Sequence, residues 1–93
     1  MGIIKVAANS RTSAVAGAIA GAYRDQGFVE IQAIGASAVN QAIKALVIAK
    51  GYLAEENKVI LFVPSMVEVE IEGAVRTALR LSVETVEAER DKP

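Results

Sequence analysis

The sequence lacks cysteine and histidine altogether. Without cysteine the chain cannot form a disulfide, and without either residue it lacks the usual ligands of protein zinc sites. Thiol and imidazole chemistry are excluded on the same ground. We see no nucleophile and base pair, metal cluster or cofactor fingerprint among the remaining residues. We therefore expect no catalysis, no metal and no cofactor.

Aromatic residues are also scarce, at 4% of the chain, and no apolar run reaches the roughly 18 residues that a membrane span needs. The core must therefore be built mainly from aliphatic side chains. No basic segment followed by a long apolar stretch and a cleavage site is visible at the N-terminus, so no secretory signal is indicated. We expect a soluble, cytoplasmic protein that has no contact with a membrane and no small-molecule substrate.

The chain has 93 residues, of which 53% are hydrophobic, enough for one domain with its own core. We expect residues 1–86 to form that domain and the charged residues 87–93 to be a disordered tail. Residues 1–50 contain five basic and two acidic residues, whereas residues 51–93 contain five basic and nine acidic residues. A polyanion should therefore prefer the N-terminal half.

Hydrophobic periodicity divides the chain into strands and helices. The predicted order is strand 3–8, helix 13–26, strand 28–34, helix 37–50 ended by Gly51, strand 58–66, and a hairpin that continues through 67–84. Right-handed crossovers in this β-α-β-α-β-β order place both helices on one face of a four-stranded mixed sheet. The predicted fold is a two-layer α/β sandwich.

The strand at 58–66 is apolar on both faces, so both faces need cover. We assign Val59, Leu61 and Val63 to the core. Ile60 and Phe62 then lie on the opposite face, where a second copy of the chain would remove them from water. The sequence therefore predicts a homodimer.

Three carboxylates, Glu68, Glu70 and Glu72, alternate along the first arm of the hairpin and share one face. A three-residue loop at 72–74 would place Glu70 opposite Arg76 as a cross-strand charge pair. Exposed charges of this kind keep strands soluble. We interpret the row as a structural feature that binds no metal.

Two polar regions could bind a ligand. At Ile34-Gly35-Ala36 a strand turns into a helix whose free N–H groups could hold a phosphate, although one glycine is a weak motif and close packing also explains it. The second region combines Asn9, Ser10 and Arg11 with the polar face of the second helix, which carries Asn40, Gln41 and Lys44. An ordinary solvent-exposed surface without a ligand would contain the same kinds of residues.

Several segments of the chain resemble the stage V sporulation protein S family from about Ile4 to Glu84. These segments are Lys5-Val6, Ser13 to Ala20, Ile31 to Gly35, Val39 to Ala45, Ala49 to Tyr52, and Arg76 to Leu79. That family is similar to the Alba chromatin proteins, which share the β-α-β-α-β-β order, form dimers and bind DNA or RNA. The resemblance implies an Alba-like domain that acts as a nucleic-acid-binding regulator in sporulation.

By position, the Alba contacts before helix one and at the start of helix two correspond to Ser10, Arg11 and the turn at Gly35. Most of the basic residues of the Alba pattern are replaced here, and the hairpin is acidic. The expected nucleic-acid-binding residues are Lys5, Ser10, Arg11, Gly35, Asn40, Gln41 and Lys44. A regulator that binds another protein instead of nucleic acid is the alternative.

Overall fold

The computed structural model describes residues 2–88 and contains two helices and four strands in the predicted β-α-β-α-β-β order. In chain order the elements are β1 (Ile3–Val6), α1 (Thr12–Gln26), β2 (Val29–Ala33), α2 (Ala36–Ala54), β3 (Lys58–Ile71) and β4 (Ala74–Glu87). Neither helix in this part of the chain is long and apolar enough to cross a membrane.

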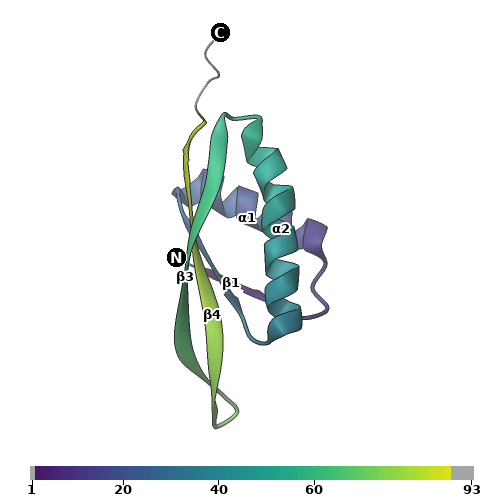
Figure 1. The fold of residues 1–93 in the computed structure, drawn as a ribbon, viewed down its shortest axis with the longest axis vertical. Coiled ribbons are helices and arrows are strands. Elements are labelled where there is room, and N and C mark those ends of the chain that lie inside the picture. Colours follow the sequence, from purple (N-terminus) through teal and green to yellow (C-terminus); the bar gives the residue numbers. More distant parts are fainter. Residues whose placement is uncertain (1, 89–93) are drawn as a thin grey trace.

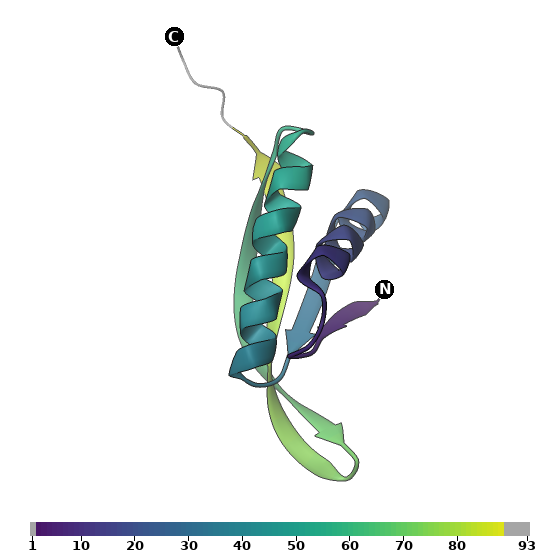
Figure 2. The ribbon, with the colours of Figure 1, turned by 90° about the vertical axis from the view of Figure 1, so that its right-hand side faces the viewer.

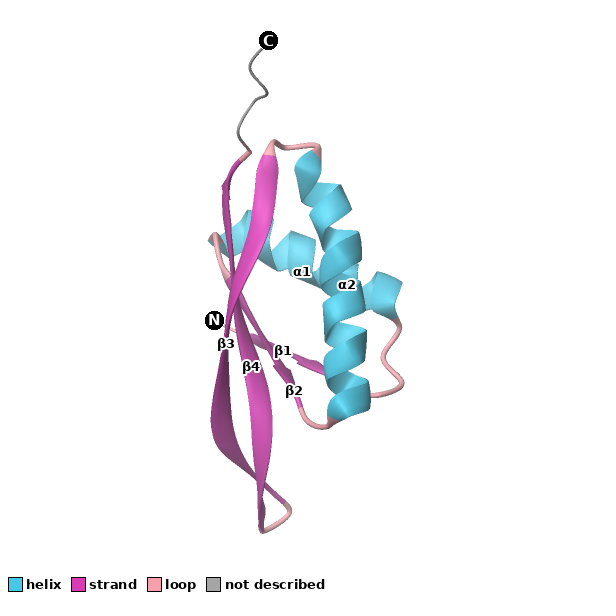
Figure 3. Ribbon diagram, viewed as in Figure 1, coloured by secondary structure: helices cyan, strands magenta, loops and turns pink. Residues whose placement is uncertain are grey.

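The strands form one sheet in the order β1-β2-β4-β3. The β1 and β2 strands are parallel, and β4 is antiparallel to both of its neighbours. Both helices cover the same face of the sheet, and the other face is open (Figure 1, Figure 2). The predicted two-layer sandwich with a mixed sheet is confirmed (Figure 3).

The core lies between the sheet and the helices and is almost entirely aliphatic. The central strands contribute large side chains that are fully buried, among them Ile31 and Val83. The α2 helix contributes a stripe of buried alanines, Ala42, Ala45 and Ala49. Small side chains at these positions let α1 and α2 pack closely against each other and the sheet.

The second helix is longer than predicted. It continues through Gly51 and ends at Ala54, so the prediction that Gly51 stops it was wrong. Leu53 lies in the added turn and is fully buried. Burial of a leucine side chain contributes about 1.5–3 kcal/mol, more than the roughly 1 kcal/mol that a glycine costs inside a helix.

At the other end of the sheet, β4 extends to Glu87, where the predicted tail was to begin. The ammonium of Lys58 lies 2.8 Å from the Glu87 carboxylate. The hydrogen bond and the charge of Lys58 lower the pKa of Glu87. The rest of the predicted tail, residues 89–93, lies outside the described residues.

The face assignment of β3 was wrong. Phe62 is paired with the buried Val83 of β4, and direct cross-strand partners lie on the same face of a sheet. Ile60 and Phe62 therefore face α2, and Ile60 packs against the core. Val59, Leu61 and Val63 alternate with them and lie on the open face instead, although all three were assigned to the core. The run of five apolar residues has no alternation, so its period could not indicate which face is buried.

The hairpin register also differs from the prediction. Ile71 pairs directly with Ala74, which leaves a two-residue turn at Glu72 and Gly73. Both turn residues have positive φ, 51° and 82°, as a type I′ turn requires. Glu70 is therefore opposite Val75, and Arg76 is opposite Val69 on the other face. The predicted pair of Glu70 with Arg76 does not form.

The turn yields a stability prediction. Glutamate is strained at positive φ, whereas asparagine tolerates it. We expect Glu72→Asn to raise the free energy of unfolding by roughly 0.5–1 kcal/mol in urea denaturation. Glu70→Asn removes the same charge from an exposed strand position and should not stabilise the protein. Equal effects of the two changes would attribute the gain to charge and contradict the turn geometry.

Candidate functional site

The loop between β1 and α1 is a tight turn that brings Ser10 back to Ala7. The Ser10 N–H donates to the Ala7 carbonyl at 3.0 Å. In return, the Ala7 N–H donates to the Ser10 hydroxyl at 2.8 Å. The turn ends at Arg11, which is exposed and stands at the N-cap position of α1.

A side-chain hydrogen bond attaches this loop to α2. The Gln41 Nε2 group donates to the Ser10 carbonyl at 2.7 Å. Gln41 lies in the second turn of α2, so the start of α1 is held beside the first turns of α2. The structure thus brings together the two parts of the predicted polar region, the loop at Ser10 and the polar face of α2.

Both helices begin without a side-chain cap and without an acidic residue in the first turn. Their first N–H groups are therefore free, and the helix dipoles add partial positive charge there. Gly35 at the start of α2 has φ 92° and ψ 155°, a conformation that essentially only glycine adopts. The local backbone explains why glycine stands at this position.

Two exposed cations, Arg11 and Lys44, lie in this region. Asn40 and Lys44 are four residues apart on α2 and so share one face of the helix. The segments 7–12 and 35–44 contain no carboxylate. We call this region the helix-start surface; its members are Ser10, Arg11, Gly35, Asn40, Gln41 and Lys44.

The seventh predicted residue, Lys5, lies elsewhere. It alternates with the helix-facing Ile4 and Val6 along β1 and therefore points to the open face of the sheet. There it lines a groove with Gln32 and Arg80. The structure thus separates Lys5 from the helix-start surface. Sequence reasoning missed Arg80 in this groove, although its alternation with buried leucines placed it on the outward face of its strand.

The acidic residues Glu68, Glu70 and Glu72 are exposed on the outer part of the hairpin. In residues 2–88 no group of three or more carboxylates is arranged to hold a metal ion. Arg76 lies on the other face of the hairpin, so it does not neutralise the row. That the row binds no metal stays a prediction.

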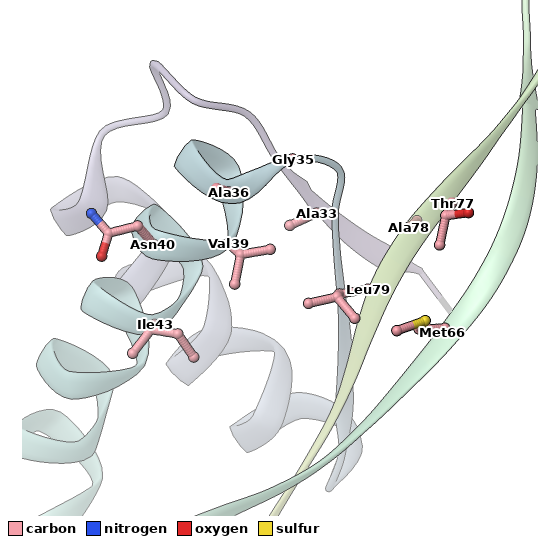
Figure 4. Close-up of a pocket in the computed structure, with 10 residues that line it drawn as sticks. All are labelled: Ala33, Gly35, Ala36, Val39, Asn40, Ile43, Met66, Thr77, Ala78 and Leu79. Atoms are coloured by element: carbon pink, nitrogen blue, oxygen red, sulfur yellow. The ribbon is translucent and has the colours of Figure 1, made fainter.

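An apolar strip follows the seam between α2 and β3. A groove of about 570 Å³ begins near Gly35 and is lined by Val39, Ile43 and Met66 (Figure 4). A smaller groove continues it between Ile43, Val47 and Phe62. We call these five residues the α2–β3 strip. Met66, Val47 and Phe62 are 74%, 64% and 38% exposed.

These features define a small two-layer α/β protein with a polar, carboxylate-free surface at its helix starts and an apolar strip beside it. Residues 2–86 match the model of the stage V sporulation protein S (SpoVS) family, and the chain belongs to that family. The resemblance found in the sequence is confirmed. The protein is therefore related to sporulation.

The link between Gln41 and Ser10 can be tested by mutation. We expect Gln41→Ala to lower the free energy of unfolding by about 1 kcal/mol, because one hydrogen bond is lost. Amide exchange at residues 7–11 should become faster. Asn40→Ala is the control, since Asn40 is exposed and its side chain forms no hydrogen bond within residues 2–88. Unchanged exchange in the loop would show that Gln41 does not hold it.

Proposed function

We propose that this protein is a nucleic-acid-binding regulator of sporulation that binds the DNA or RNA backbone as a homodimer. The helix-start surface is the binding site. One observation carries the proposal: two uncapped helix N-termini lie side by side with Arg11 and Lys44, and no carboxylate lies in their segments. The resemblance to the Alba proteins supports the same surface.

The chemistry of this surface suits phosphate groups. Free helix N–H groups can donate to phosphate oxygens, and the guanidinium and ammonium groups supply charge. No member of the helix-start surface is aromatic, so it offers no ring on which bases could stack. Such contacts position a nucleic acid without reading its sequence. We therefore expect weak, salt-sensitive binding with low specificity.

The dimer is proposed to form through the α2–β3 strip. The apolar side chains of the strip remain partly in water in a single copy, and burying them against a second copy is favourable. Although β3 is an edge strand, Pro64 in it has no N–H. Proline interrupts pairing with another strand along an edge. Contact between side chains of the two strips is thus favoured over a continuous sheet.

A regulator that binds another protein is the second candidate. The pI near 5.4 is low for a nucleic-acid-binding protein, and the apolar strip could receive a partner's side chains instead of a second copy. The two candidates differ in one measurement, which is affinity for nucleic acid at low salt.

Charge reversal tests the binding surface. We expect Arg11→Glu/Lys44→Glu to weaken binding of labelled DNA and RNA at least about tenfold in fluorescence anisotropy, for every sequence alike. A wild-type dimer that engages both cations of each copy should show a slope of log K against log salt of roughly −3.6 on duplex DNA. The double variant should flatten this slope.

The matched control is Lys5→Glu/Arg24→Glu, which changes the net charge equally at positions outside the helix-start surface. Its affinity should fall much less. An equal loss in both double variants would mean that only net charge matters and would contradict the assigned site. If the wild type has no affinity at low salt, the protein-binding candidate replaces the proposal.

The dimer is tested by light scattering. We expect the wild type to be a dimer at tens of micromolar and Val47→Asp to be a monomer, because a buried charge in the strip opposes association. Val47 is exposed in a single copy, so the substitution should leave the fold intact.

Val75→Asp is the control, since Val75 is 66% exposed on the hairpin and outside the strip. It should remain a dimer. If Val63→Asp on the open face dissociates the dimer and Val47→Asp does not, the interface is on the other side of the sheet. A monomeric wild type would overturn the dimer itself.

A further inference from the structure

Polar side chains cross the open face of the sheet in a single row. Lys5 of β1 pairs with Gln32 of β2, Gln32 pairs with Arg80 of β4, and Arg80 pairs with Ser65 of β3. Neighbouring strands are about 4.8 Å apart, so Lys5 and Arg80 stand on strands separated by about 10 Å, with Gln32 between them. Two cations thus share a row with no carboxylate in it.

The guanidinium of Arg80 is held in place but only partly satisfied. Its Nη2 group donates to the Gln32 Oε1 atom at 2.8 Å, and Gln32 is only 9% exposed. The Nε group of Arg80 is buried and has no hydrogen-bond partner in the structure. Within residues 2–88, ion pairs join Arg24 to Glu56 and Lys58 to Glu87, and none involves Lys5 or Arg80. The protein therefore orients this guanidinium without neutralising it.

Three members of this row, Lys5, Gln32 and Arg80, line a groove of about 520 Å³. The outer part of the β3–β4 hairpin provides one wall, because the hairpin bends toward the side of the sheet where β1 lies (Figure 2). Apolar side chains surround the two cations; they are Ile3, Ile34, Val69 and Ile71. The groove therefore combines positive charge with a largely apolar lining.

Glu70 also lines the groove, but it alternates with Val69 and Ile71 along β3, so its carboxylate points away from their face of the hairpin. A groove of about 520 Å³ suits a small ligand better than a polyanion such as a nucleic acid. The apolar lining favours a ligand whose negative group is attached to a hydrocarbon portion.

We propose that the groove formed by Lys5, Gln32 and Arg80 binds a small amphipathic oxyanion, a carboxylate or phosphate group attached to an apolar body. Arg80 donates to the oxyanion through its remaining Nη hydrogens, and Lys5 supplies the second charge. Gln32 is the positioning residue for Arg80. The apolar body lies against the hairpin wall. This site is on the opposite face of the sheet from the helix-start surface, so it does not depend on nucleic-acid binding.

The test is an NMR titration of the ¹⁵N-labelled full chain. Hexanoate and hexyl phosphate are the two anionic probes, hexanol is the neutral control, and inorganic phosphate is the control without an apolar body. We expect saturable shifts of the Arg80 Nε–H and Gln32 side-chain amide signals with both hexyl anions. Hexanol should cause no such shift, and inorganic phosphate should bind at least about tenfold more weakly. The tighter of the two hexyl anions identifies the preferred head group.

Variants separate this site from non-specific charge effects. Arg80→Gln should weaken binding at least about tenfold, and Lys5→Gln, at an exposed position, should weaken it a few-fold. Arg11→Gln and Lys44→Gln should leave it unchanged.

Some outcomes would overturn the proposal. One is the absence of saturable shifts with either hexyl anion; another is equal shifts with hexanol. Unchanged affinity in both Arg80→Gln and Lys5→Gln would also overturn the proposal. Because Lys5 is exposed, Lys5→Gln should fold and can be measured even if Arg80→Gln does not fold. None of these outcomes bears on the DNA and RNA measurements.

Discussion

Burial of the helix-facing side chains of β2 and β4 is the constraint on which the other features depend. Val29 pairs with Val83 and Ile31 with Leu81, and all four are removed almost completely from water. Each such burial contributes roughly 1.5–3 kcal/mol, and a shift of one residue would turn all of them toward solvent. The register of the sheet is therefore fixed at its centre. Because β1 and β3 pair with these central strands, the same register determines which of their side chains face the helices.

This register divides the cations of the N-terminal half between two surfaces. Because Ile4 and Val6 follow the core face of β2, Lys5 must point to the open side, where the same register places Arg80. Arg11 and Lys44 belong to elements that cover the other face. Three of the five cations of residues 1–50 are thus divided between two separate surfaces. The surface on the helix side suits a backbone of phosphates, whereas Lys5 lies in a groove on the open face of the sheet.

The sequence was sufficient for the element order and the two-layer architecture, because alternation and helical periodicity are strong in β2, α1 and α2. It also brought the loop at Ser10 and Gln41 into one candidate site, although their hydrogen bond depends on how α1 crosses α2. The predicted faces of Ile60 and Phe62 were wrong because an uninterrupted apolar run has no alternation that could indicate the buried side. The pairing of Glu70 was wrong because Glu72 gives no sequence signal for positive φ. Arg80 was overlooked because its row exists only once three strands are aligned.

The position of Arg80 is not explained by stability. A half-buried guanidinium with an unsatisfied Nε carries a desolvation cost, and a single hydrogen bond to a neutral amide offsets little of it. An apolar residue of similar size would pack against Ile34 and Val69 without that cost, and such replacements of buried charges are often neutral or stabilising. Gln32 is nearly buried, and its side-chain carbonyl oxygen accepts a hydrogen bond from Arg80. The fold orients this charge at a cost to its own stability and pairs it with no counter-ion among residues 2–88, so an anion that arrives from outside accounts for it best.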